Sequence, residues 1–187
     1  SHLVPGVKIQ RTHHLLSNAE RDYLTVLERD KSIIDIREQY PLLTQAETQA
    51  IASSFNFPHP VYPGTQVPVV RTTDFLITFL DSSGEAKLAA RSVKYRKEFE
   101  DSDIGVQNRI AEKLAIEEKY WAMRDVEWKL VLHENLSKNR IANLSILRTY
   151  ANIHPALPTE KNIENLFAFI ARCKTDQIPL KVLLDKA

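Results

Sequence analysis

The chain has 187 residues, of which 43% are hydrophobic, and this suits one domain of ordinary size with a real core, or one domain with a small appendage. Its 25 Lys and Arg against 24 Asp and Glu give a net charge of +1, which excludes a protein that coats nucleic acid by charge alone. Cys173, the single cysteine, excludes an internal disulfide and a multi-cysteine zinc site.

The sequence gives no sign of a membrane segment. No apolar run approaches the roughly 20 residues that a membrane helix needs, and the first residues lack a charged leader followed by a hydrophobic stretch. We therefore expect a soluble, cytoplasmic protein with no membrane contact. The chain does not begin with Met, so we expect the natural chain to start further upstream.

The first half of the chain predicts two helices separated by a strand, and then a loop. Residues 1–12 show no clear periodicity, but Ser17-Asn18-Ala19-Glu20 is a capping-box pattern that begins a helix ending near Asp30. The elements expected after this helix are a short β-branched strand over 32–37 leading into a turn at Tyr40-Pro41, a helix over about 45–55 capped by Thr44, and a loop with four prolines over 56–68.

The second half predicts a hairpin, a helix and another strand. The hairpin strands cover 74–81 and 86–95, with a turn at Ser82-Ser83-Gly84-Glu85. A helix over about 106–123 and a strand over 127–133 follow. This order of helices and strands predicts an α/β sandwich with a mixed sheet.

After His133 the pattern predicts helices only, over about 139–150, 160–174 and from 180 onward, separated by prolines. We place a domain boundary near residue 152, which divides the chain into 1–152 and a small helical segment over 153–187. The last helix lacks a C-terminal cap, so we expect the natural chain to continue.

The predicted hairpin brings an acid and a lysine together. A turn centred near residue 83 or 84 places Asp74 opposite about residue 93, between Ser92 and Lys94. Because side chains alternate along a strand, Ser92 and Lys94 share one face while Val93 points to the other. The arrangement resembles the acid-x(n)-acid-x-Lys core of restriction-type nucleases, in which a carboxylate holds a divalent metal and the lysine polarises the attacking water or the scissile phosphate.

Two glutamates occupy positions that favour burial. Glu20 lies four and seven positions before Leu24 and Leu27 on one helical stripe, so it either completes the capping box with Ser17 or points to the edge of the core. Glu117 follows the buried spacing of its helix, where an ionised carboxylate is costly without a cation. We weigh an ion pair of Glu117 with Lys113 or Arg109 against a role beside Lys94.

Two further polar features have simpler interpretations. His13 and His14 point in different directions, so we predict a surface segment rather than a metal or phosphate contact. A basic cluster on and after the second hairpin strand either steers DNA or forms a solvated edge; its members are Arg91, Lys94, Arg96 and Lys97.

Six segments, in this order and with similar spacing, resemble the TnsA family, the endonuclease subunits of heteromeric cut-and-paste transposases. The segments are Arg11-Thr-His-His-Leu-Leu-Ser-Asn-Ala-Glu20, Asp35-Ile-Arg-Glu-Gln-Tyr-Pro-Leu-Leu43, His59-Pro60, Thr72-Thr-Asp-Phe-Leu76, Ser92-Val-Lys94 and Leu114-Ala-Ile-Glu-Glu-Lys-Tyr-Trp121. The resemblance covers residues 11 to about 150.

The resemblance implies a restriction-endonuclease-like catalytic domain over 1–152, with a mixed sheet flanked by helices. It implies cleavage of the non-transferred strand, at the 5′ side, where transposon ends lie in double-stranded DNA. The implied partners are the transposase TnsB, which makes the 3′-side cuts, and the AAA+ ATPase TnsC. Residues 153–187 correspond to the start of a winged-helix-like region, and the implied location is the bacterial cytoplasm, at the nucleoid.

The family's catalytic positions match Glu20, Asp74, Ser92 and Lys94, with Glu117 near the site. Glu20, Asp74 and Ser92 are the ligands implied for Mg²⁺ or Mn²⁺. The family pattern has Gln two residues before the lysine, where this chain has Ser92. A hydroxyl reaches a metal less readily than an amide carbonyl, so we expect Ser92 to act through a water, while Asp74 and Glu20 supply two anionic ligands.

Two other functions remain open. The chain could be a bridging subunit that links transposase and ATPase while contributing little chemistry, which the Ser92 departure favours. It could also be an autonomous restriction or repair nuclease of the same fold, which cleavage of plain duplex DNA would favour.

Overall fold

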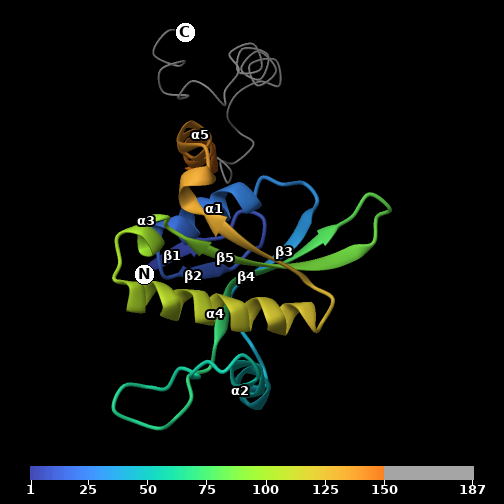
Figure 1. The fold of residues 1–187 in the computed structure, drawn as a ribbon. Coiled ribbons are helices and arrows are strands. Elements are labelled where there is room, and N and C mark those ends of the chain that lie inside the picture. Colours follow the sequence, from blue (N-terminus) through green and yellow to red (C-terminus); the bar gives the residue numbers. More distant parts are fainter. Residues whose placement is uncertain (150–187) are drawn as a thin grey trace, which may run out of the picture.

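The structure, a computed structural model, describes residues 1–149 (Figure 1). Its strands are β1 (His2–Pro5), β2 (Thr12–Leu15), β3 (Ile33–Pro41), β4 (Thr72–Leu80), β5 (Ala86–Lys94) and β6 (Glu127–Leu132). Its helices are α1 (Asn18–Leu27), α2 (Gln45–Ser54), α3 (Lys97–Glu100), α4 (Ile104–Ala122) and α5 (Lys138–Thr149), with a 3₁₀ turn at His133–Asn135. The predicted helices beyond residue 149, and the boundary near 152, lie outside the described residues.

The main sheet has four strands in the order β3-β4-β5-β6. Neighbours are antiparallel except β5 and β6, which run parallel and are connected through α3 and α4. A parallel pair requires such a crossover, because a short turn cannot return the chain to the same end of the sheet. The predicted α/β class with a mixed sheet flanked by helices is confirmed.

Alternation along the central strands separates two cores. Phe75 and Ile77 pack with α1 on one face of the sheet, while Leu76 and Ala90 pack with α4 and α2 on the other. Figure 1 shows α4 lying under the sheet with α2 beneath it, and α1 and α5 on the opposite side. Because every second residue of β4 and β5 faces α4, polar residues at those positions enter the same layer.

The predicted helices agree with the structure at α1, α2 and α4, and the hairpin of β4 and β5 is confirmed. Its register differs by one residue: Phe75 pairs with Arg91 and Leu80 with Ala86, which brings Asp74 opposite Ser92 rather than residue 93. The turn is centred on Ser83, because the backbone N–H of Asp81 donates to the Glu85 carbonyl at 2.9 Å and Leu80 pairs with Ala86.

Four elements were not predicted correctly: β1, β2, the end of β3, and α3. Residues 1–12, which lack periodicity, contain β1, and β1 pairs antiparallel with β2. The strand β3 continues through the expected turn at Tyr40-Pro41, because pairing with β4 outweighs the local proline signal. The short helix α3 was missed. The Thr44 side chain also makes no capping hydrogen bond at α2.

No helix within residues 1–149 combines the length and the apolar character needed to cross a membrane.

Candidate active site

Glu20 closes the capping box at the start of α1. Its backbone N–H donates to Ser17 Oγ at 3.1 Å, and Ser17 Oγ donates to Glu20 Oε1 at 2.8 Å. The other carboxylate oxygen, Oε2, accepts the backbone N–H of Leu16 at 2.9 Å. The side chain is buried, with 4% of the residue exposed, so both expectations for Glu20, capping and a position at the core edge, are confirmed.

Gln39 connects this carboxylate to the central sheet. Its Nε2 donates to Glu20 Oε2 at 3.1 Å, and its Oε1 accepts Thr72 Oγ1 at 3.1 Å. On β3, Gln39 stands between Glu38, paired with Phe75, and Tyr40, paired with Thr73, so its register position faces Asp74. Gln39 has a φ of 46°, the left-handed region that side chains other than Gly rarely adopt. This conformation aims one amide at both α1 and β4.

Asp74 and Lys94 form an ion pair at the end of the hairpin. Asp74 Oδ2 accepts the backbone N–H of Val93 at 2.7 Å and lies 3.2 Å from Lys94 Nζ. Lys94 Nζ also donates to the Val93 carbonyl at 3.1 Å. Both side chains are partly exposed, at 14% for Asp74 and 27% for Lys94, so a substrate can reach the pair. The predicted apposition of Asp74 and Lys94 is present.

Glu117 lies in the interior next to this pair. Ser92 Oγ donates to Glu117 Oε1 at 2.5 Å, and Thr73 Oγ1 donates to the same oxygen. Burial raises the pKa of Glu117 above its ordinary value, the hydrogen bonds from Ser92 and Thr73 oppose this, and the charge of Asp74 adds to it. Neither Lys113 nor Arg109 forms an ion pair with Glu117, so that alternative is wrong.

Arg71 brings a further cation to these acids. Burial lowers the pKa of its guanidinium, and the carboxylates of Glu117 and Asp74 oppose that effect. Its Nε is buried without a hydrogen-bond partner in the described structure.

Three consecutive residues of β4 therefore organise the site. Thr72 contacts Gln39 and through it Glu20, Thr73 contacts Glu117, and Asp74 contacts Lys94. The segment 72–76 was part of the family resemblance, but nothing in its pattern assigned roles to the two threonines. Sequence reasoning missed Gln39 and Thr73, because each contacts a carboxylate that is distant in sequence. It also missed Arg71, whose interaction with Glu117 depends on how α4 packs on the sheet.

The donor set suits a hard, oxygen-preferring cation. No described residue donates to Asp74 Oδ1, which leaves a carboxylate oxygen available beside Lys94. Glu20 carries a second carboxylate near the same end of β4, and its oxygens have lone pairs beyond those used in capping. Within residues 1–149, no three His, Cys, Asp or Glu side chains cluster as a metal site, so further ligands would be water or backbone oxygens.

Two polar features differ from their simple interpretations. His13 is fully buried and its Nδ1 lies 2.8 Å from Glu38 Oε2, so the prediction of a surface position is wrong for His13, although His14 is exposed.

The basic cluster is largely neutralised: Arg91 pairs with Glu127, Lys94 with Asp74 and Arg96 with Glu100.

Comparison with known proteins identifies the family. A family model described as TnsA-like endonuclease N terminal matches residues 30–133. Transposon Tn7 transposition protein TnsA of Escherichia coli is 38% identical over 128 residues, which cover 68% of this chain and 43% of that relative. The chain thus spans less than half the length of this curated relative. The family model covers more than half of the chain and includes Asp74, Ser92, Lys94 and Glu117, and the chain therefore belongs to the family of TnsA-like endonuclease N-terminal domains.

Proposed function

We propose that this chain is the endonuclease subunit of a transposase complex, which cleaves the non-transferred strand at the 5′ sides of transposon ends. The observation that carries the proposal is the partly exposed ion pair of Asp74 and Lys94, with an available carboxylate oxygen on Asp74. The family membership and the name of the Escherichia coli relative, a transposition protein, support a setting in DNA transposition.

Asp74 and Glu20 are the residues proposed to hold Mg²⁺ or Mn²⁺. Such a cation lowers the pKa of a bound water and offsets charge on the phosphate. Asp74 is oriented by the backbone N–H of Val93, and Glu20 by Leu16, Ser17 and Gln39, so neither carboxylate needs to reorganise on binding. The proposed role of Ser92 as a ligand stays a prediction, since its hydroxyl donates to Glu117.

Lys94 is proposed to orient the attacking water and to stabilise the negative charge that develops on the phosphate. Its ammonium is held by Asp74 and by the Val93 carbonyl, which leaves one of its three protons for the substrate. A fixed cation at this point acts without reorganising during the reaction, which is the condition under which electrostatic stabilisation is most effective.

The protonated form of Glu117 is favoured by burial, and we propose that Glu117 positions the end of β5 rather than contacting substrate. Its carboxyl accepts hydrogen bonds from Ser92 of β5 and from Thr73 of β4. Ser92 lies two positions before Lys94, and Thr73 lies directly before Asp74. A change in this contact would move the ion pair.

The proposal is tested by strand-specific nicking. Duplex DNA carrying a transposon end is incubated with the full chain, TnsB and Mg²⁺, and the two strands are labelled separately. Asp74→Ala should abolish 5′-side cleavage while assembly with TnsB, measured by co-sedimentation, persists. The matched control is Asp35→Ala, which removes a half-exposed aspartate from the neighbouring strand, where it pairs with Arg37 at 2.9 Å.

The other functions give different results in this assay. Wild-type protein that assembles but never nicks would identify a bridging subunit. This outcome is tested because the Ser92 hydroxyl donates to Glu117 and not to a metal ligand position. Cleavage of plain duplex without TnsB would identify an autonomous nuclease. Unchanged 5′-side cleavage by Asp74→Ala would overturn the assignment of the site.

A further inference from the structure

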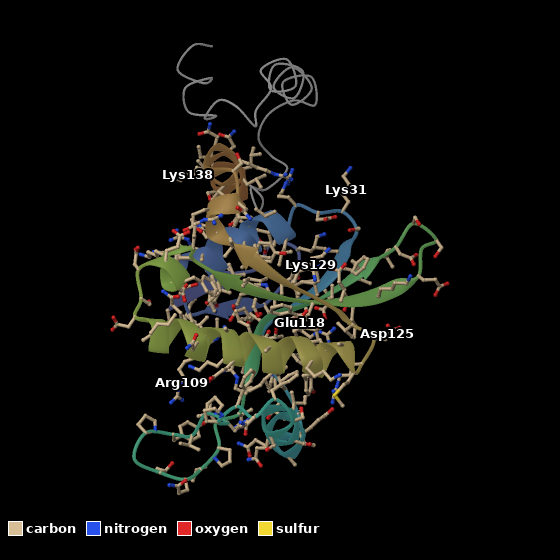
Figure 2. All side chains as sticks on the ribbon, in the orientation of Figure 1. Lys31, Arg109, Glu118, Asp125, Lys129 and Lys138 are labelled. Carbon is tan, nitrogen blue, oxygen red and sulfur yellow. The ribbon has the colours of Figure 1, made fainter. Side chains whose placement is uncertain are left out.

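A cavity with charged side chains in one wall lies between α4 and the proline-rich loop that follows α2. It has a volume of about 330 Å³. Its walls include His59 and Pro60 from the loop, and Arg109, Glu112 and Lys113 from α4. Figure 2 shows Arg109 on the side of α4 that is turned toward this loop.

The loop wall is fixed in place. His59 Nε2 lies 3.0 Å from Thr48 Oγ1 on α2, and His59 Nδ1 lies 3.0 Å from the Pro60 carbonyl. The backbone of Val69 donates to Pro60 at 2.9 Å, which closes the base of the loop. The prolines restrict the backbone further, so the loop wall of the cavity has little conformational freedom.

The cations of this cavity lack counterions. Among residues 1–149, no partner in a salt bridge or hydrogen bond is found for the Arg109 or Lys113 side chain, and Glu112, the acid in the cavity wall, pairs with neither of them. Burial lowers the pKa of Lys113, and the positive charges of Arg71, Arg109 and Lys94 lower it further. Such an arrangement of like charges is unfavourable by itself and becomes favourable when an anion binds.

The cations also lead toward the proposed catalytic residues. Arg109, Lys113 and Glu117 follow one another at intervals of four residues on α4, so Arg109 and Lys113 lie about 6 Å apart along the helix axis and about 12 Å separates Arg109 from Glu117. Phosphates of one DNA strand advance by about 3.4 Å per nucleotide along the duplex axis. The axial separation of about 6 Å between the two cations therefore corresponds to about two nucleotides of one strand. The positive charge of Lys94 acts on Lys113, so the two cations lie within electrostatic reach of the candidate active site.

We propose that Arg109 and Lys113 bind backbone phosphates of the DNA strand beside the cleavage position. The inference rests on the proposed function, because it assigns the strand that the nuclease site acts on. A chain with a net charge of +1 needs a local group of cations without acidic partners to hold DNA. Arg109 and Lys113 form such a group, whereas the cluster around Arg91 and Arg96 is largely neutralised.

The test measures the salt dependence of DNA binding. The full chain carrying Asp74→Ala, which cannot cleave under the proposed function, is bound to duplex DNA with a transposon end over a range of salt concentrations. Adding Arg109→Gln and Lys113→Gln should reduce the slope of log K against log salt by about 1.8, because each lost phosphate contact removes about 0.9. Adding Glu112→Gln should tighten binding without changing the slope, since no phosphate contact is gained.

The matched control removes two exposed lysines from the other side of the molecule. Figure 2 shows Lys31 and Lys138 on the side of the sheet away from Arg109. The pair Lys31→Gln and Lys138→Gln changes the net charge by the same amount, and we expect it to leave the slope within about 0.3 of the parent value, as distant charges are screened. Arg109 and Lys113 are exposed on α4, so their removal should not unfold the chain.

The outcomes separate this inference from the proposed function. An equal slope for the Arg109 and Lys113 variant and its control would overturn the phosphate site, even where the wild-type chain nicks normally. A reduced slope specific to Arg109 and Lys113 would support the site, even where the wild-type chain fails to nick and acts only as a bridging subunit.

Discussion

Ser92 Oγ lies 2.5 Å from Oε1 of Glu117, and both residues are almost fully buried, at 1% and 3% exposed. The hydroxyl and the carboxyl therefore satisfy each other in the layer between the sheet and α4. An unsatisfied carboxyl at this depth would be costly, so the contact explains how a glutamate can occupy the buried stripe of α4 without an ion pair.

Ser92→Ala should lower the free energy of unfolding by about 1–3 kcal/mol, because it leaves a buried carboxyl with one donor fewer. Urea denaturation measures this. Ser83→Ala is the matched control, since it removes a serine hydroxyl that bonds to Asp81 on an exposed turn, and its effect should stay within about 0.5 kcal/mol. Equal effects of the two substitutions would contradict the structural role of the Ser92 contact.

The stability of the protein should fall as pH rises above the ordinary pKa of a glutamate, 4.5. Burial raises the pKa of Glu117 in the folded state, so the folded protein retains a proton that the unfolded chain has released. The contribution of Glu117 to the free energy of unfolding therefore decreases between 4.5 and the raised pKa, and does not change further above it.

Glu117→Gln should remove this dependence, because an amide does not titrate and its oxygen still accepts from Ser92 and Thr73. Urea denaturation of both proteins across the pH range gives the difference directly. Parallel curves for the wild type and Glu117→Gln would show that Glu117 titrates in the folded state as it does in the unfolded chain.

Glu38 should have the opposite effect at lower pH. Its pKa is lowered from 4.5 to about 2, because hydrogen bonds from Arg11 and His13 together outweigh the effect of burial. Its contribution is complete above 4.5 and is lost as pH falls toward 2. Since Arg11 is 39% exposed and solvent screens it, we expect Glu38→Gln to lower the free energy of unfolding by about 2 kcal/mol near neutral pH.

The loss of unfolding free energy caused by Glu38→Gln should become smaller as pH falls toward 2, because the wild-type carboxylate is then protonated. Urea denaturation near neutral pH and near pH 2 measures the difference. A loss of equal size at both values would show that Glu38 acts through packing rather than through its charge.

Gln39 should control the metal requirement of cleavage. Removing the amide leaves Glu20 without its link to Thr72, so we expect Gln39→Ala to reduce nicking by about 10–100-fold and to raise the Mg²⁺ concentration that gives half-maximal rate. Titration of Mg²⁺ in the nicking assay measures both quantities. An unchanged Mg²⁺ requirement would mean that Gln39 does not position the Glu20 carboxylate.

Gln39→Gly separates this role from backbone strain. A φ of 46° costs alanine about 1 kcal/mol of conformational energy, whereas glycine adopts it without this cost. The glycine variant should therefore be the more stable of the two. Both variants lack the amide, and we expect equal losses of nicking. Recovery of nicking in Gln39→Gly alone would attribute the effect to the backbone.

The local features of the site could be predicted from sequence because each depends on neighbours along the chain. The Ser17 and Glu20 capping box, the hairpin around residues 82–85 and the buried stripe of α4 all follow from spacing within one element. The position of Lys94 beside Asp74 followed from the hairpin alone, with an error of one residue that left the contact intact.

The partners of these residues were decided by tertiary structure. The packing of β3, β4 and α4 decides which hydroxyls reach Glu117, since its contacts span 25 and 44 residues of sequence. The same packing lets Gln39 contact both Glu20 and Thr72. The same packing sets Arg109 and Lys113 against the proline-rich loop. Short-range patterns determine helices, strands and their faces, whereas burial, counterions and pKa depend on which faces meet, and no spacing along the chain carries that information.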